Sequence, residues 1–209
     1  YTGVFYRRFI LGQWAQAEGR VYDFFEPDMV GKAPEGKFDQ WYVSCDYGTV
    51  NPTSMGLWGR CGGVWYRVKE FYFSSRQQMR QMTDEEYAAA LQDLVGQRHL
   101  TAVIVDPSAA SFIEVLRRHG WNVRKAENDV LSGIRLTADC LKDGRIVICE
   151  GCADCLREMD EYVWDLGSGA KDRVRKEHDH AMDDMRYFVS TVIGKQQGSF
   201  VACTVERKK

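Results

Sequence analysis

Apolar positions along this chain form short runs that predict β-strands. The run Trp41-Tyr-Val-Ser-Cys-Asp46 is almost unbroken, which is typical of a strand buried on both faces. Two further β-type runs, 54–59 and 64–73, are joined by a Gly62-Gly63 pair, which indicates a hairpin. Together, the three runs predict an antiparallel three-stranded meander.

Helix-period patterns alternate with shorter apolar runs in the rest of the chain. The motif Thr83-Asp-Glu-Glu86 is a capping box and predicts the start of a helix that continues to Val95. Further helices are expected at 111–119, 130–143 and 179–193, and further strands at 101–105, 122–126 and 145–149. Another helix is expected to follow the last of these strands and to run through Leu156, Met159, Tyr162 and Val163. This order predicts an α/β fold with a mixed central sheet, in which parallel strands extend the meander and helices flank it.

Composition limits the number of domains and the class of protein. The 209 residues are 44% hydrophobic, which is enough for one ordinary core. Prolines and glycines recur between 27 and 36, so we expect a connecting segment at 1–38 and one domain at 39–209. The chain begins with Tyr1 rather than Met, and we therefore expect a fragment. We find no apolar run of membrane-spanning length and expect a soluble protein without a membrane partner.

Acidic side chains follow two of the predicted strands. Asp46 ends the first strand and Asp106 follows the strand at 101–105, each directly before a turn. Each aspartate alone is equally well explained as a turn residue, but α/β folds usually build their sites at strand carboxyl ends. Carboxylate oxygens with open positions suit Mg²⁺ or Mn²⁺. Two such ions can activate water for phosphodiester cleavage.

The helix predicted at 179–193 opens with a third acidic cluster. His180, Asp183, Asp184 and Tyr187 lie three to four positions apart, so they share one side of the helix. His180 and Asp183 can therefore approach the same ion, although the spacing does not choose between Asp183 and Asp184. The alternative is that the acids only favour the helix N-terminus through its dipole.

Two other groups carry a possible function. A basic run before the acidic helix is predicted to bind DNA phosphates, and a solvated loop is an equally good explanation. The run consists of Lys171, Arg173, Arg175 and Lys176. Cys149, Cys152 and Cys155 have metal-ligand spacing, but no Cys or His nearby in sequence completes the set, so we interpret them as thiols. The net charge of −2 neither marks nor excludes a nucleic-acid binder.

Three motifs occur in order: Asp-x-Gly-x-x-x-Pro-Thr at 46–53, Val-Asp-Pro-Ser at 105–108 and Asp-His-Ala-Met-Asp-x-x-Arg-Tyr at 179–187. They resemble the C-terminal nuclease domain of the large terminase subunit of tailed phages and prophages. The segment 7–22 also looks like the family's stretch between ATPase motor and nuclease. The resemblance covers nearly the whole chain.

The resemblance implies an RNase H-like fold and a metal-dependent endonuclease that cuts concatemeric double-stranded viral DNA with two Mg²⁺ or Mn²⁺ ions. Asp46, Asp106 and Asp183 would be the metal-binding carboxylates, with His180 as a ligand or an orienting residue. Implied partners are DNA, the ATPase domain, the small terminase subunit and the portal, in the host cytoplasm. The chain has no Gly-x-x-x-x-Gly-Lys-Ser/Thr loop, so the ATPase half is expected to be absent.

Three alternatives remain open at this stage. The run from Asp46 to Thr49 also resembles the phosphate loop of actin-like kinases, but 209 residues leave no room for their second domain. A Holliday-junction resolvase would share the carboxylates, but usually not the N-terminal segment. A non-catalytic DNA-binding or docking module would carry vestigial acids, and the presence of all three carboxylates argues against it.

Overall fold

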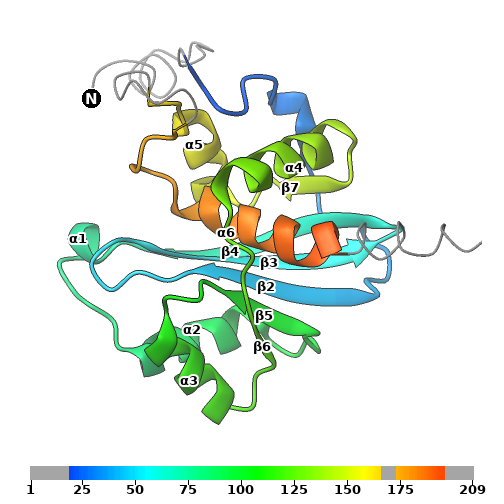
Figure 1. The fold of residues 1–209 in the computed structure, drawn as a ribbon. Helices are drawn as coiled ribbons and strands as arrows, with labels where there is room; N and C mark the ends of the chain where they lie inside the picture. Colours follow the sequence, from blue (N-terminus) through cyan, green and yellow to red (C-terminus); the bar gives the residue numbers. More distant parts are fainter. Residues whose placement is uncertain (1–18, 166–172, 196–209) are drawn as a thin grey trace, which may run out of the picture.

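A seven-stranded mixed sheet forms the centre of the described residues, 19–165 and 173–195 of the computed structural model (Figure 1). The strands are β1 Val30–Gly31, β2 Gln40–Asp46, β3 Thr53–Cys61, β4 Val64–Phe73, β5 Ala102–Val105, β6 Val123–Lys125 and β7 Ile146–Cys149. The helices are α1 Ser75–Gln78, α2 Asp84–Val95, α3 Ala110–Arg118, α4 Val130–Lys142, α5 Ala153–Glu161 and α6 His180–Phe188.

The order of strands across the sheet is β1-β7-β4-β3-β2-β5-β6. Strands β2, β3 and β4 form the predicted antiparallel meander, and the remaining neighbours pair in parallel. The turn between β3 and β4 needs its glycines, because Gly62 and Gly63 have φ angles of 59° and 85°. The predicted hairpin and mixed sheet are therefore confirmed.

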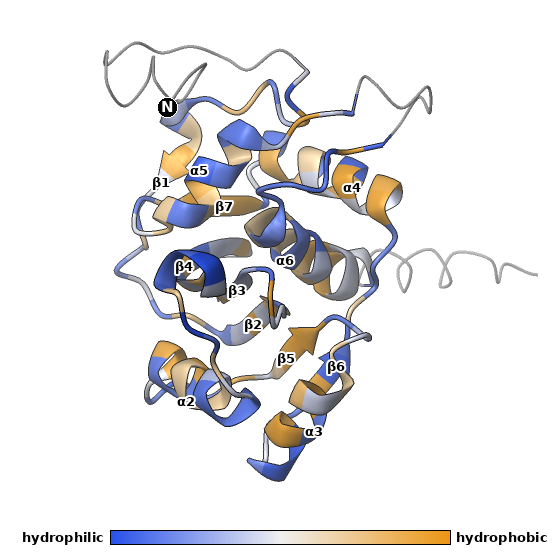
Figure 2. Ribbon diagram, turned by 90° about the vertical axis from the view of Figure 1, so that its left-hand side faces the viewer, coloured by the Kyte–Doolittle hydropathy of each residue, from blue (hydrophilic) through white to orange (hydrophobic). Residues whose placement is uncertain are grey.

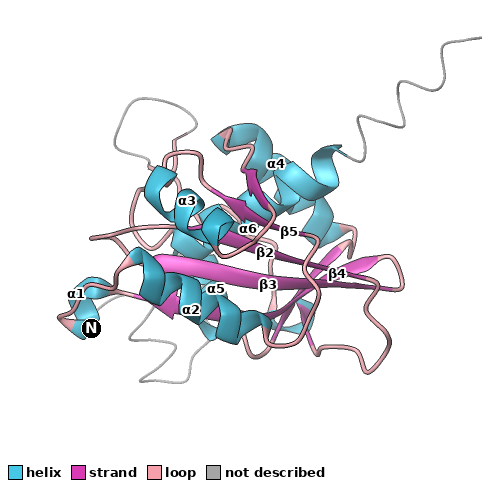
Figure 3. Cartoon of the chain, turned by 90° about the horizontal axis from the view of Figure 1, so that it is seen from below, coloured by secondary structure: helices cyan, strands magenta, loops and turns pink. Residues whose placement is uncertain are grey.

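Helices cover both faces of the sheet. Helices α2 and α3 lie on one face, and α4, α5 and α6 lie on the other (Figure 1). Figure 3 views the sheet from the side of α2 and α3. In Figure 2, hydrophobic and hydrophilic residues alternate around these helices, as expected for helices with one buried side. Within the described ranges, no helix is long and apolar enough to cross a membrane.

The segment predicted as a linker, 1–38, packs against the domain over its described part. Tyr22 and Phe25 are buried in the core, and Arg20 donates to Asp160 at 2.8 Å. Strand β1 adds to the sheet beside β7. Residues 1–18 lie outside the described residues, and the role of 1–38 as a link to another domain stays a prediction.

Three local expectations need correction. The helix expected to reach Val163 ends at Glu161, because Tyr162 is extended and the chain then pairs Val163 with Arg20. Strand β1 and helix α1 were not predicted, since elements of two and four residues carry no measurable periodicity. The last predicted helix is present, but it changes to a π-helical segment over Val189–Gly194.

Candidate active site

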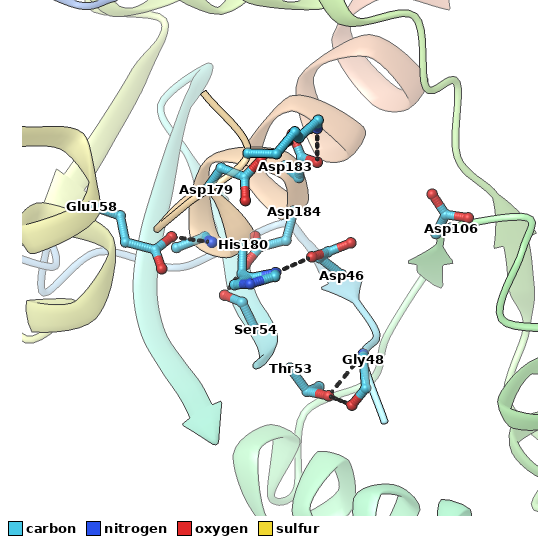
Figure 4. A network of polar contacts seen from close by, with 12 residues as sticks. Asp46, Gly48, Thr53, Ser54, Asp106, Glu158, Asp179, His180, Asp183 and Asp184 are labelled. Atoms are coloured by element: carbon cyan, nitrogen blue, oxygen red, sulfur yellow. Dashed lines mark hydrogen bonds and ion pairs between the residues drawn. The ribbon is translucent and has the colours of Figure 1, made fainter. Parts of the chain in front are cut away.

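Two aspartates meet at one edge of the sheet because neighbouring strands carry them. Asp46 ends β2 and Asp106 directly follows β5, and these strands run parallel with Cys45 opposite Val105. Tyr187 of α6 lies between the two carboxylates. Its hydroxyl donates to Asp106 Oδ2 at 2.7 Å and lies 3.5 Å from Asp46 Oδ1. The two strand-end carboxylates thus share one edge (Figure 4).

Helix α6 crosses this edge and supplies the third group of side chains. His180 Nδ1 lies 2.9 Å from Asp46 Oδ2 (Figure 4). Asp183 Oδ1 accepts a hydrogen bond from Arg186 at 2.8 Å, and its Oδ2 accepts one from Lys176 Nζ at 3.3 Å. Asp46, His180 and Asp183 line one cavity of about 260 Å³, which we call the carboxylate cavity.

Asp183 and Asp184 are neighbours in sequence but lie in different surroundings. Asp184 is fully buried, accepts a hydrogen bond from Ser44 Oγ at 2.8 Å and one from Arg67 Nη2 at 3.0 Å. Ser54 also donates to it. The helical spacing left the choice between the two open. In the structure Asp183, and not Asp184, lies on the wall of the carboxylate cavity.

Burial and neighbouring charges shift the pKa values of three side chains in the site. Burial raises the pKa of Asp46 to about 6; the hydrogen bond with His180 opposes this rise and the charge of Asp183 adds to it. Burial acts to lower the pKa of His180, but Asp46 reverses the effect and raises that pKa overall. For Asp106, burial acts upward, yet hydrogen bonds from Ser108 bring its pKa below the ordinary value. A bound cation would relieve the repulsion at Asp46.

The donor set suits a hard divalent cation, since it consists of carboxylate oxygens and one imidazole. Among the described residues, however, no three such side chains are gathered at the spacing that holds a metal ion. Two of the predicted carboxylates are instead held by protein groups: Tyr187 donates to Asp106, and Lys176 donates to Asp183. A cation between Asp46 and Asp183 would take the place of the Lys176 ammonium, and the exposed lysine has room to leave.

The predicted DNA-binding run reaches the site at one residue. Lys176 lies on the wall of the carboxylate cavity, beside Asp183. Arg173 and Arg175 are exposed and line a neighbouring cavity of about 420 Å³, which also contains Lys176. Lys171 lies outside the described residues. The described part of the run therefore leads from an exposed basic surface into the carboxylate cavity.

The three regularly spaced cysteines are free thiols in the core. Burial raises the pKa of Cys149 to about 11 and that of Cys152 to about 12, and it also raises the pKa of Cys155 well above its ordinary value. Cys152 Sγ donates to the carbonyl oxygen of Arg67 at 3.2 Å. Buried neutral thiols pack as small apolar side chains.

Sequence reasoning missed the group that fixes the start of α6. Glu158 of α5 is fully buried and accepts hydrogen bonds from the Ala181 N–H and the Tyr72 hydroxyl, both at 2.6 Å. These bonds hold the first turn of α6, where His180 lies. Nothing local to Glu158 marks it as buried, because its partners come from β4 and α6.

Comparisons with known proteins agree with this geometry. A family model described as the terminase RNaseH-like domain matches residues 60–191, which confirms the expected fold family. The large terminase subunit of Escherichia phage T5 is 22% identical over 202 residues, which cover 90% of this chain and 45% of that protein.

Solved structures give the same result. The large terminase of a thermophilic bacteriophage, solved in complex with ADP, has 46% sequence identity and a TM-score of 0.81, covering 92% of this chain and 50% of that chain. The large terminase nuclease of the thermophilic phage G20c with bound magnesium has 14% identity and a TM-score of 0.62, covering 83% and 98%. The chain thus spans about half the length of the T5 protein and of the ADP-bound large terminase.

Proposed function

Because this chain belongs to the terminase RNaseH-like domain family, we propose that it is the nuclease part of a phage large terminase subunit. It cuts concatemeric double-stranded viral DNA in the host cell during genome packaging. The ATPase half, the small terminase subunit and the portal are proposed partners of the whole protein, since the chain spans about half the length of the T5 protein and of the ADP-bound large terminase.

One observation carries the proposal. Two strand-end carboxylates, Asp46 and Asp106, lie at the same edge of the sheet, and α6 brings His180 and Asp183 to that edge. Asp46 and Asp183, from separate elements, line one open cavity, and Asp106 lies beside Asp46 across the Tyr187 hydroxyl. Carboxylates placed in this way can hold hard divalent cations. The magnesium bound in the G20c nuclease supports the use of such ions.

We assign Asp46, Asp106 and Asp183 as the residues that would hold two Mg²⁺ or Mn²⁺ ions. Such a pair supplies an activated water and stabilises the leaving oxygen in phosphodiester cleavage. His180 orients the Asp46 carboxylate through its Nδ1 atom, and Tyr187 orients Asp106. Both aspartates are therefore positioned by neighbours before any cation binds.

The basic run holds the substrate in this proposal. Lys171, Arg173, Arg175 and Lys176 bind backbone phosphates, which gives salt-dependent binding without sequence preference. The described members of the run are exposed beside the carboxylate cavity, which supports this role.

Nicking of a supercoiled plasmid tests the function. We expect cutting with Mn²⁺ or Mg²⁺, none with EDTA, and a loss of at least about 100-fold in Asp46→Ala, because a metal-binding carboxylate is removed. Asp93→Ala is the matched control, since Asp93 is an exposed aspartate of α2 and should leave cutting unchanged.

Two results would contradict the nuclease proposal. One is the absence of cutting with either ion by a folded chain. The other is equal cutting by the Asp46→Ala and Asp93→Ala variants. DNA binding without cutting would instead favour the alternative, a non-catalytic docking module.

A further inference from the structure

A second cavity, of about 610 Å³, adjoins the carboxylate cavity. Its wall is formed by the loop after β2, the end of β4 with α1, helix α5 and the segment before α6. Asn51, Lys176 and His180 line both cavities, which are therefore adjacent. A ligand that occupies the carboxylate cavity can extend into this second one, which we call the side cavity.

Cationic side chains enter the side cavity from three separate elements. Arg76 comes from α1, Arg157 from α5 and Lys176 from the segment before α6, against the two carboxylates of Glu161 and Glu177. Cations thus exceed carboxylates on the wall, although Lys176 also pairs with Asp179 and Asp183 and Arg157 with Asp154. This balance suits an anionic ligand better than a cation.

The two arginines differ in how firmly they are held. Arg157 donates to Asp154, and its guanidinium lies 5.2 Å from the centroid of the Tyr72 ring. Arg76 is an exposed residue on the wall of the side cavity. A guanidinium offers several N–H donors in a planar fork that matches a phosphate. Asn51 and Gln77 add amide donors to the same wall.

We propose that the side cavity binds the sugar-phosphate backbone of the DNA strand directly next to the phosphate that is cut. The inference rests on the proposed nuclease function and names a further part of its DNA site. Pockets of roughly 300–1,000 Å³ enclose small ligands, so the side cavity has room for a nucleotide unit of one strand. Amide and guanidinium donors are typical partners of backbone phosphates.

The side cavity also adjoins the basic run. Arg173 and Arg175 line the cavity of about 420 Å³ together with Asp165, and this cavity shares Lys176 and Glu177 with the side cavity. The acids of the carboxylate cavity repel a DNA backbone, so a strand that reaches them needs cations close by. Arg76 and Arg157 provide such cations on the wall of the side cavity.

The salt dependence of DNA binding tests the proposal. A fluorescently labelled duplex is titrated with the chain in Ca²⁺ at a series of NaCl concentrations. We expect Arg76→Ala to weaken binding by about threefold to fivefold at moderate salt. The plot of log K against log[salt] should become shallower by about 0.9, because one phosphate contact is lost. Arg76→Glu should weaken binding further.

Arg117→Ala is the matched control, because Arg117 is an exposed arginine on α3, on the opposite face of the sheet. It should leave both the affinity and the salt slope unchanged. In plasmid nicking, Arg76→Ala should raise KM and leave kcat unchanged, since the residue holds DNA away from the reacting atoms.

The outcomes separate the two proposals. If the wild-type chain cuts DNA and both Arg76 variants keep its salt slope and KM, the side-cavity proposal is wrong while the nuclease function stands. If the wild-type chain neither binds nor cuts DNA, both proposals fail. A slope change in the Arg76 variants equal to that of Arg117→Ala would also overturn the side-cavity proposal.

Discussion

The two faces of the sheet both bury hydrophobic clusters, but they differ in the charged side chains that they bury beside them. On the side of α2 and α3, the buried cluster is hydrophobic throughout. Val43, Met55 and Leu57 from the strands pack with Leu91 and Phe112 from the helices. This face carries no residue that we assign to the site. It acts as a conventional core whose stability comes from removing apolar surface from water.

On the side of α4, α5 and α6, the same strands bury a second hydrophobic cluster, which includes Trp58 and Phe188, and they bury charges as well. Arg67 of β4 and Asp184 of α6 form an ion pair with both side chains fully buried, and Ser44 and Ser54 donate to the same carboxylate. The strands leave space for this pair. At Gly56, an added Cβ would collide with the Arg67 guanidinium.

The difference shows how one sheet serves two purposes. The apolar face supports the fold, while the charged face fixes α6, the helix that carries His180 and Asp183. A buried ion pair adds little net stability because both charges lose their hydration, but removing one partner is costly. Substitutions on the two faces should therefore have different effects on stability and on DNA cleavage, and the predictions that follow separate these effects.

The largest effect is expected at the buried ion pair. Arg67→Met leaves the Asp184 carboxylate buried without its cation, so the free energy of unfolding should fall by about 4 kcal/mol. Urea denaturation followed by circular dichroism measures this change. In the double variant Arg67→Met/Asp184→Asn the Asp184 charge is removed as well. Glu70 loses its contact with Arg67 but keeps the hydrogen bonds from the Asp154 and Cys155 N–H groups, so more than half of the loss should be recovered. A single variant within about 1 kcal/mol of wild type would contradict the assignment.

A cavity made in the apolar face should lower the stability of the fold without slowing DNA cleavage. Leu91 of α2 is fully buried, and Leu91→Ala should lower the free energy of unfolding by about 3 kcal/mol, because it leaves a cavity. The nicking rate per folded molecule should stay at the wild-type value. A Leu91→Ala variant that folds but cuts slowly would show that the two faces are coupled.

Much of the apolar face could be predicted from the sequence. The buried run of the first strand and helical spacing after Thr83 are local signals, and the Thr83–Glu86 capping box forms as expected. The strand-end position of Asp46 and Asp106 was equally readable, because the buried runs themselves mark where each strand ends.

The charged face could not be predicted in the same way. Arg67 and Asp184 are 117 positions apart, and nothing near either residue identifies its partner. Lys176 was predicted from its basic neighbours to bind DNA, but it also pairs with Asp183, a contact that depends on how the chain turns into α6. Such pairings are properties of the three-dimensional packing rather than of any local pattern.

The smallest of the expected effects is a pH dependence carried by the charged face alone. Burial raises the pKa of Glu158 from an ordinary 4.5 to about 7, although the hydrogen bonds from Tyr72 and Ala181 oppose the rise. A carboxyl with a raised pKa in the folded state stabilises the fold below its ordinary pKa, and this contribution is lost as the pH rises through the folded value. Between about pH 5.5 and 7.5, Glu158 should therefore lower the free energy of unfolding by about 2 kcal/mol.

The slope of the free energy of unfolding against pH, compared between variants, separates the contribution of Glu158 from that of other titrating groups. Glu158→Gln should remove that part of the pH dependence, while Glu150→Gln, at an exposed glutamate before α5, should retain it. Urea denaturation at several pH values gives the slopes. If Glu158→Gln and wild type lose stability in parallel over this range, Glu158 ionises as freely in the folded state as in the unfolded state. The start of α6 would then not depend on a buried, protonated carboxyl, and any pH dependence of the charged face would come from other groups, such as Asp46.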